Sequence, residues 1–542
     1  MTMKKIKFNL VYFLFASLVF TSCESDLEIE PENPNVFLSE EFFFTEDAYQ
    51  KGLAGVYGNL SLTGTSGPES SNIGGIDAGT SQYGRCLWYL QNLTTDEAVW
   101  SYEGDGGVRE LQRNIWTAGN PIIRGMFSRA MFQVALCNEY LRQTTPEKLS
   151  SRGVTDASLL SKIVEYRSEI KALRALAYYH LMDLFGKAAF NTENQPVAIA
   201  GEEYNRQELF QYLETELTTL IPELKAPRTN EAGRLDQAFA RMILAKMYLN
   251  AEVYIGQNRY QDCMTQCEAI IAGGYVLENN YLDNFKADND TSTEIIFAIQ
   301  SDGEITQNYG PTTIMINGSV GSLEQNGTAL GVGAGGWGGA IRLRKQFVEK
   351  FNGVDFDYDA RKTILGGGPR SLEIQDISDR NQGYILTKYS NVSSTGITGS
   401  NSTFVDTDFP LFRLADVYLM YAEAQMRKDG ATNGSGTTNA SQQSLDYINA
   451  LRFRANGDSF ANVSTSQVTL DFILDERARE LHWEAHRRQD LIRFGKYAGG
   501  TYNWAWKGNA ASGVSISSNL NVYPIPTLAL AANPNLTQNT GY

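Results

Sequence analysis

The sequence is poor in cysteine, in histidine and in basic charge. Its 542 residues include five Cys and three His, and 46 Lys plus Arg stand against 62 Asp plus Glu, which gives a formal net charge of −16. So few cysteines exclude a disulfide scaffold. The acidic balance argues against a protein that binds nucleic acid electrostatically, because such a protein needs a basic surface. With 42% hydrophobic and 20% charged residues, the composition is that of a globular protein.

The first residues form an export signal. Three lysines precede the apolar run Phe8 to Phe20, which is too short to span a bilayer comfortably and is followed at once by small residues. Phe20-Thr-Ser-Cys23 resembles a bacterial lipoprotein box in which Phe20 replaces the usual Leu. We therefore predict a signal peptide over 1–22 and a lipid on Cys23, which would anchor the protein without crossing the membrane. The alternative is an ordinary secretory signal whose cysteine survives.

An acidic stretch with two prolines follows Cys23 and is predicted to be a lipidated tether over 23–38. Its acidic residues resemble the surface-export signal of Bacteroidetes lipoproteins. The remaining residues, 39–542, are predicted to form a single unit.

Helical periodicity dominates that unit. Apolar residues recur at intervals of three and four from Ile163 to Leu184, and Gly186 is expected to end this long helix. Similar patterns predict helices over 236–254, 258–271, 411–426, 442–454 and 468–494. The fold class is therefore mostly α, with helical repeats mainly in 39–57, 120–273 and 411–494.

The regions 58–119 and 274–410 are predicted to be loop-rich decoration on the helical frame. Short β-like runs occur at 294–300 and 384–389 among glycine and polar clusters.

The string Leu-Ala-x-x-Tyr occurs three times, beginning at Leu53, Leu244 and Leu414. In a helix the small residue lets a neighbouring helix approach closely, and the tyrosine one turn later fills the space beside it. This pattern is typical of tetratricopeptide-like helical pairs. Because the copies are far apart and irregularly spaced, we expect pairs interrupted by insertions and no regular solenoid.

Several longer motifs occur in a familiar order along the whole chain. They are Arg174 to Gly186 (RALAYYHLMDLFG), Pro410 to Ala424 (PLFRLADVYLMYAEA), Glu476 to Glu480 (ERARE), Arg488 to Gly495 (RQDLIRFG) and the ending from Tyr523 to Tyr542. Together with the export signal they resemble the SusD/RagB family of outer-membrane glycan-binding lipoproteins.

The resemblance implies about four tetratricopeptide-like units, a lipid anchor in the outer membrane at the cell surface, and capture of oligosaccharides. It also implies a SusC-like TonB-dependent transporter as partner. No cofactor and no catalytic residues are expected. Within the motifs, Arg488, Asp490 and Arg493 are predicted to form a buried ion pair and to make no ligand contact.

Sugar rings present apolar C–H faces and hydroxyl edges, so a glycan site needs flat aromatic surfaces with hydrogen-bonding groups around them. Aromatic residues in loops are therefore the candidates. Trp337 lies among glycines in 331–339, Tyr309 lies in an Asn-Tyr-Gly turn, and Trp100 and Tyr102 precede a glycine-rich stretch. The alternative for Trp337 is that its indole packs into a neighbouring part of the fold.

The starch-binding founding member of the family uses an arc of two Trp and one Tyr around the curve of an α-glucan. By motif position, Trp337 and Tyr309 resemble two members of that arc, while Tyr102 stands where the second Trp would be and follows Trp100. Arg85 resembles an arginine that reaches sugar hydroxyls, and Asp105 falls where that site has Asn. The predicted glycan-binding residues are therefore Trp337, Tyr309, Tyr102, Arg85, Asp105, Asn308 and Trp100.

The change from Trp to Tyr at position 102 keeps a stacking surface. An α-1,4-glucan such as starch or a maltooligosaccharide is the first choice of ligand, while a β-1,3-glucan or a fructan remains open. A surface glycoside hydrolase is the weaker alternative, because carboxylate spacing is not visible in sequence. Three His leave few choices for a general base.

Other patterns are interpreted as structural. Gly331-x-Gly333-x-x-Gly336 lacks the βαβ context of a dinucleotide site. His482 and His486 are expected on one helix face, packed or solvated and without zinc. Cys263 and Cys267, together with Cys86 and Cys137, are expected to be buried small hydrophobes. Asp288 and Asp290 leave a structural Ca²⁺ possible, although the full ligand loop of a specific site is missing.

Overall fold

The computed structural model describes residues 42–43, 45–197 and 199–542. The predicted signal peptide, Cys23 and the whole of the predicted tether over 23–38 lie outside the described residues. The chain divides into two compact units, Met1–Lys51 and Gly52–Tyr542, and this division falls within helix α3 (Glu46–Ser61). In the first unit the ring of Phe43 lies 5.5 Å from that of Tyr49. The domain boundaries expected from the sequence stay predictions.

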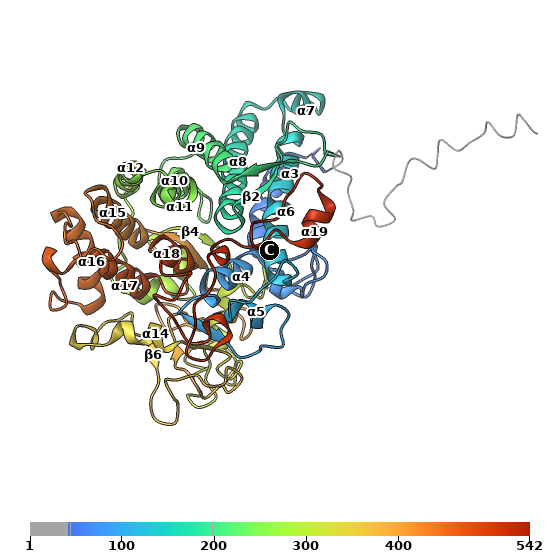
Figure 1. Cartoon of the computed structure of the whole chain (residues 1–542). Helices are drawn as coiled ribbons and strands as arrows, with labels where there is room; N and C mark the ends of the chain where they lie inside the picture. Colours follow the sequence, from blue (N-terminus) through green and yellow to red (C-terminus); the bar gives the residue numbers. More distant parts are fainter. Residues whose placement is uncertain (1–41, 44, 198) are drawn as a thin grey trace, which may run out of the picture. The chain divides into compact units, whose positions relative to one another are not determined.

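The second unit is mostly helical (Figure 1). The helices that follow α3 are α4 (Tyr83–Trp88), α5 (Val108–Gln112), α6 (Pro121–Gln143), α7 (Pro146–Ser151), α8 (Ala157–Phe185), α9 (Arg206–Leu220), α10 (Gln237–Leu249), α11 (Ala251–Ile255), α12 (Tyr260–Ile271), α13 (Pro311–Gly318), α14 (Lys345–Val348), α15 (Leu414–Lys428), α16 (Gln442–Asn456), α17 (Leu470–Leu481), α18 (Arg487–Arg493) and α19 (Thr527–Ala532).

The long helix α8 begins and ends where local chemistry dictates. The side chain of Asp156 accepts a hydrogen bond from the backbone N–H of Leu159 and so caps the first turn. Gly186 takes a left-handed conformation with φ of 69°, which L-residues with a side chain rarely adopt, and this ends the helix. The predicted helix with its glycine stop is confirmed.

Neighbouring helices pack in succession. Helix α6 packs on α8, α8 on α9, α10 on α12, α12 on α15, and α15 on both α16 and α17. The Leu-Ala-x-x-Tyr strings lie in α3, α10 and α15, and both Ala245 and Ala415 are fully buried. This arrangement confirms the predicted mostly helical class with tetratricopeptide-like pairs.

Among the described residues the strands form four two-stranded antiparallel sheets, β1 with β5, β2 with β3, β4 with β8 and β6 with β7. The strands are β1 (Ala98–Trp100), β2 (Lys187–Phe190), β3 (Glu202–Asn205), β4 (Ile295–Ile299), β5 (Ile341–Leu343), β6 (Ile364–Leu365), β7 (Ile385–Leu386) and β8 (Phe409–Arg413). The predicted β-like run at 294–300 contains β4, whereas the run at 384–389 contains only the two-residue β7.

The prediction that 58–119 is loop-rich decoration on the helical frame is wrong for residues 83–93, which are helical and buried. Helix α4 and the π-helical turn after it, Tyr89–Leu93, are buried throughout, and Trp88 is fully enclosed. A segment that is buried on every side carries no amphipathic period, so the sequence pattern does not reveal it.

The helix predicted over 468–494 is also wrong, because two helices, α17 and α18, occupy it. The helical conformation is interrupted between them, where Trp483 and Ala485 both have φ of 62°. His482 and His486 lie in this break and do not share a helix face. Likewise, the helix expected from residue 411 begins at Leu414, because residues 409–413 pair with β4 as strand β8.

Buried ion pairs join the C-terminal helices to β8. The Arg413 guanidinium donates to Glu480 and Glu484 at 2.6–2.8 Å, and Glu480 also accepts from Arg361 and Arg454. The buried ion pair predicted in the RQDLIRFG motif is confirmed for Arg493 and Asp490, which lie 2.8 Å apart in the interior, whereas the buried Arg488 donates to the Leu520 carbonyl at 2.9 Å. The four described cysteines are free and buried, as expected.

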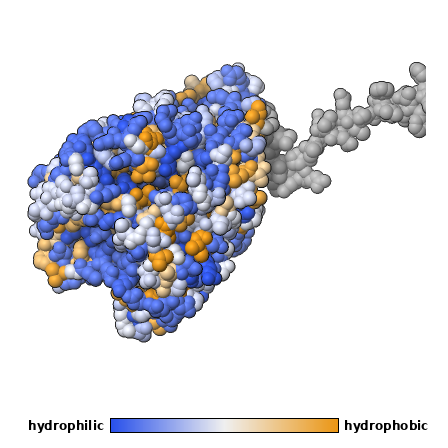
Figure 2. All heavy atoms as spheres, in the orientation of Figure 1, coloured by the Kyte–Doolittle hydropathy of each residue, from blue (hydrophilic) through white to orange (hydrophobic). Residues whose placement is uncertain are grey.

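The face of the molecule in Figure 2 is mainly hydrophilic, with hydrophobic residues in small scattered groups. Across the described part of the chain, every helix is too short or too polar to serve as a membrane span.

The ion-pair cluster gives a stability prediction. Replacing Glu480 by Gln removes a buried charge that pairs with the guanidinium groups of Arg361, Arg413 and Arg454, and we expect the free energy of unfolding to fall by about 3–5 kcal/mol. Urea titration followed by circular dichroism measures this change. The control is Glu231→Gln, whose carboxylate pairs with Arg234 but is 69% exposed, and its effect should stay below about 0.5 kcal/mol. Equal effects of the two variants would contradict the prediction.

Candidate functional site

Aromatic and charged side chains from four separate segments line an open cavity of about 330 Å³. The lining residues are Glu69, Asp77, Arg85, Trp100, Tyr102, Asp105, Tyr309 and Trp337. Six of the seven residues predicted from the sequence therefore meet in one place. The exception is Asn308.

The pairing of β1 with β5 brings the two tryptophan segments together. Trp100 lies opposite Ile341, and the backbone N–H of Ser101 continues the ladder by donating to the Ala340 carbonyl at 2.8 Å. Residues 100–105 and 337–341 therefore lie side by side, although about 235 positions separate Tyr102 from Trp337 in the sequence.

Trp100 is the base of the aromatic group. Only 2% of it is exposed, and its ring centroid lies 6.1 Å from that of Tyr102 and 6.0 Å from that of Trp337. Tyr102, Trp337 and Tyr309 are each half-buried and so keep part of their rings open to the cavity. We call these three residues the aromatic platform. Trp100 supports the platform and offers little surface of its own.

The glycine-rich loop before β5 is built to present Trp337. The backbone N–H of Trp337 donates to the Asn317 carbonyl at 2.9 Å. Gly336 has φ of 39°, and a Cβ there would lie only 2.4 Å from the Cβ of Val320. Glycine at position 336 is therefore required for close packing. This requirement gives the last glycine of the Gly331-x-Gly333-x-x-Gly336 pattern a structural explanation.

Arg85 is the cation of the cavity. It belongs to α4, whose first turn is capped by Gln82, and is 7% exposed. Its Nε donates to the Tyr89 hydroxyl at 3.1 Å and its Nη1 to the Tyr309 carbonyl at 3.4 Å. These bonds fix the guanidinium at the cavity wall, where a remaining N–H can meet a ligand oxygen.

Three carboxylates surround the platform. Asp105 accepts a hydrogen bond from the Trp100 indole N–H at 3.2 Å. Glu69 and Asp77 also line the cavity and were missed in the sequence, because they lie in a polar, glycine-containing stretch without a recognisable pattern. Burial, followed by the hydrogen bond to Glu69, raises the pKa of Tyr309, so its phenol stays neutral and can act as a donor.

Asn308 does not line the cavity. It is 4% exposed, its Oδ1 accepts from the Gly310 N–H at 2.7 Å, and its Nδ2 donates to the Thr306 carbonyl at 3.0 Å. The structure thus corrects its expected role, because these local bonds use its amide to hold the turn that carries Tyr309.

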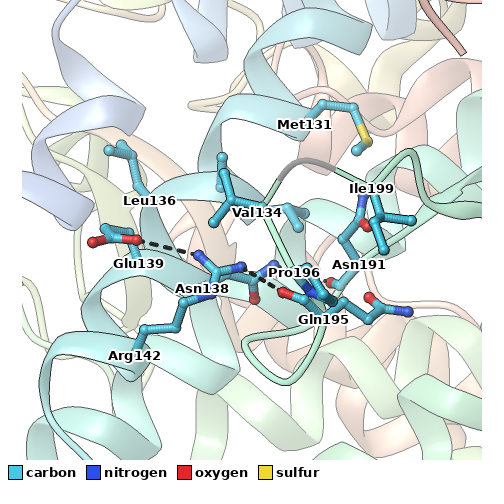
Figure 3. A pocket seen from close by; sticks show the side chains of 12 residues that line it. Met131, Val134, Leu136, Asn138, Glu139, Arg142, Asn191, Gln195, Pro196 and Ile199 are labelled. Atoms are coloured by element: carbon cyan, nitrogen blue, oxygen red, sulfur yellow. Dashed lines mark hydrogen bonds and ion pairs between the residues drawn. The ribbon is translucent and has the colours of Figure 1, made fainter. Parts of the chain in front are cut away.

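A second cavity, of about 370 Å³, lies between α6 and residues 191–199 (Figure 3). Met131, Val134 and Ile199 give it apolar walls. Arg142 pairs with Glu139 one turn before it on α6 and donates across the cavity to the Gln195 carbonyl at 3.5 Å. Its described lining residues supply no ring on which a sugar could stack. The cavity with the aromatic platform is therefore the candidate site.

Asp288, which the sequence suggested as a Ca²⁺ ligand, is bonded to a neighbouring loop. The carboxylate of Asp288 accepts hydrogen bonds from the backbone N–H and hydroxyl of Ser394. Within the described ranges, no three His, Cys, Asp or Glu residues gather as a metal site would require. The Ca²⁺ that the sequence left possible at Asp288 and Asp290 thus has no three-ligand cluster to support it among the described residues.

The chain is similar to a known family and to several curated proteins. The model of the SusD family matches residues 242–542. The chain is 33% identical to the starch-binding protein SusD of Bacteroides thetaiotaomicron, with 96% of each chain covered, and 25% identical to SusD-like protein P25 of Formosa agariphila, with 90% of each covered.

Solved structures agree on the fold. Surface glycan-binding protein A from Bacteroides fluxus superposes with a TM-score of 0.67 at 19% identity, covering 92% of this chain and 100% of that one. A SusD homologue from Bacteroides thetaiotaomicron superposes with a TM-score of 0.68 at 18% identity, covering 93% and 98%. The family model spans more than half of the sequence, and the first relative is similar over nearly all of it. The chain therefore belongs to the SusD family.

Proposed function

We propose that this protein captures neutral glucan chains on the aromatic platform and does not cleave them. The observation that carries the proposal is the meeting of Tyr102, Tyr309 and Trp337, all half-exposed, with Arg85 in one open cavity. Rings of this kind cover the apolar faces of sugars, and the surrounding polar groups exchange hydrogen bonds with hydroxyls. The site lies in a family that includes a starch-binding protein at 33% identity.

Charge and family similarity narrow the ligand class. Three carboxylates and one arginine line the cavity, so a glycan that carries carboxylate or sulfate groups would meet net repulsion. Similarity to a starch-binding protein makes an α-1,4-glucan our first choice. A β-1,3-glucan and a fructan are the alternatives.

Affinity electrophoresis of the purified protein in starch, laminarin, inulin and polygalacturonate gels tests the ligand class. We expect retardation in starch and free migration in polygalacturonate, with dissociation constants in the micromolar to millimolar range, on the order of 4–8 kcal/mol of binding free energy. A reducing-end assay on the same samples tests for cleavage. Free migration in every glucan gel, or release of reducing ends, would refute the proposal.

Trp337→Ala should weaken binding of maltooligosaccharides at least tenfold, or about 1.4 kcal/mol, because it removes one stacking surface. The thermal midpoint should change by less than about 2 °C, since the indole is half-exposed. Titration calorimetry and thermal melts measure the two effects. The control is Tyr358→Ala, which removes an aromatic ring that is 84% exposed and outside the cavity. Unchanged affinity in the Trp337 variant, or a large fall in stability, would show that the indole serves packing.

The cellular role proposed here is that of a surface lipoprotein that passes glycan to a SusC-like TonB-dependent transporter in the outer membrane. Family membership supports this role, and the lipoprotein box at Cys23 supplies the anchor. Copurification of the tagged protein with a large outer-membrane barrel tests the partnership.

Cys23→Ala should move the protein from the membrane to the soluble fraction, because the lipid is attached to that sulfur. Cell fractionation followed by immunoblotting measures the distribution. Ser25→Ala, two residues away, is the control and should stay with the membrane. If Cys23→Ala partitions like the unmodified sequence, the lipoprotein interpretation fails.

A further inference from the structure

We propose that Arg380 is a positioning residue, which holds Tyr102 and Trp337 at the spacing that a glucan chain must span. This inference rests on the proposed function of the aromatic platform. Arg380 does not line the cavity, so it acts on a ligand through the two rings.

Arg380 touches both members of the pair. Its Cζ lies 4.5 Å from the centroid of the Tyr102 ring, and its Nη1 donates to the Trp337 carbonyl at 3.2 Å. The Tyr102 hydroxyl donates to the same carbonyl at 3.5 Å. One guanidinium therefore covers part of the tyrosine ring and ties it to the tryptophan backbone. A cation placed over the face of an aromatic ring is attracted to the ring's electrons, so this contact favours one position of the Tyr102 ring.

The glycine-rich loop accommodates this contact. Gly338 has φ of 63°, and a Cβ at that position would lie 3.0 Å from Nη1 of Arg380. A side chain there would press on the guanidinium that reaches the Trp337 carbonyl. Gly338, after Trp337, thus leaves room for the Arg380 guanidinium, and Gly336, before Trp337, leaves room for Val320.

The segment around Arg380 is itself held by two further arginines. Arg342, which is buried on β5, donates to the carbonyls of Ile377, Asp379 and Gln382. Arg370 donates to the Arg380 carbonyl at 2.6 Å, and its guanidinium is fixed by two 2.8 Å bonds to Glu324. The segment that presents Arg380 is therefore braced on β5, which also carries the Trp337 loop.

This bracing has a consequence for binding. A half-exposed ring without support must be ordered when a ligand arrives, and this loss of side-chain freedom weakens binding. A short sugar that stacks on a single ring depends little on the distance between Tyr102 and Trp337. A longer chain that contacts both rings depends on that distance directly. Loss of Arg380 should therefore weaken long chains much more than short ones.

The test compares Arg380→Met, which keeps most of the aliphatic stem, with Arg380→Lys, which keeps the charge but loses the planar fork. Lys362→Met, which removes an exposed charge elsewhere, is the control. Maltose and maltoheptaose are titrated against each protein by NMR. We expect Arg380→Met to weaken maltoheptaose about tenfold and maltose less than twofold, with Arg380→Lys in between and the control unchanged. Equal losses for both sugars would overturn the proposal, because they indicate direct sugar contact or general loosening.

A measurement without ligand separates this inference from the proposed function. Acrylamide quenching is recorded for each protein and for its Trp337→Phe counterpart, and the difference isolates the Trp337 fluorescence. We expect Arg380→Met to make Trp337 about twofold more quenchable while the thermal midpoint stays within about 2 °C. Unchanged quenching would overturn the positioning role even if glucan binds. If wild-type protein binds neither sugar, the α-1,4-glucan choice of the proposed function fails, and the quenching result alone decides the role of Arg380.

Discussion

The pairing of β1 with β5 is the constraint on which the site depends. Three residues on each strand join segments that are far apart in the sequence, and the buried guanidinium of Arg344 secures the junction by donating to the carbonyls of Ala98, Leu93, Gln112 and Ala505. Burial lowers the pKa of the Arg344 guanidinium to about 9, although the nearby charge of Asp96 opposes this shift, and the group stays charged at neutral pH. A buried charge tolerates few other arrangements, because leaving it unpaired would be costly. The bonds of Arg344 therefore help to fix the pairing of β1 with β5, in addition to the hydrogen bonds between the two short strands.

Buried ion pairs connect this strand pair to the helical frame. Asp96, two residues before β1, accepts two 2.7 Å bonds from Arg487 at the start of α18 and one from the Tyr502 hydroxyl. The neighbouring Glu97 accepts from the Trp483 N–H, and burial raises the pKa of its carboxyl to about 8. Residues beside the family motifs thus serve the site without touching it, because they anchor the segment that leads into Trp100 and Tyr102.

The site itself combines rigid support with open surface. Trp100 is sealed beneath the platform, glycines admit close packing around Trp337, and arginines brace the backbone from behind. Sugar binding by stacking gains little from each contact, so the preorganisation of the rings decides how much of that gain survives. Tyrosine in place of tryptophan at position 102 keeps a flat face and adds a hydroxyl, which here bonds to the Trp337 carbonyl. Under the proposed function, the carboxylates of Glu69, Asp77 and Asp105 would disfavour acidic glycans.

Local patterns predict the helical class, the long helix that ends at Gly186, and the rings of Trp337, Tyr309 and Tyr102 as candidates. These features appear locally, as a 3.6-residue apolar period, a glycine stop, or an aromatic residue among turn residues. Long-range contacts establish the rest: residues 83–93 are core, α17 and α18 are separate, Asn308 braces a turn, Glu69 and Asp77 line the cavity, and Arg380 contacts the platform. These features were not predicted, because three-residue strands, arginine-to-carbonyl bonds and segments buried on all sides leave no periodic signature. Their partners lie tens to hundreds of positions away, and only folding brings them into contact.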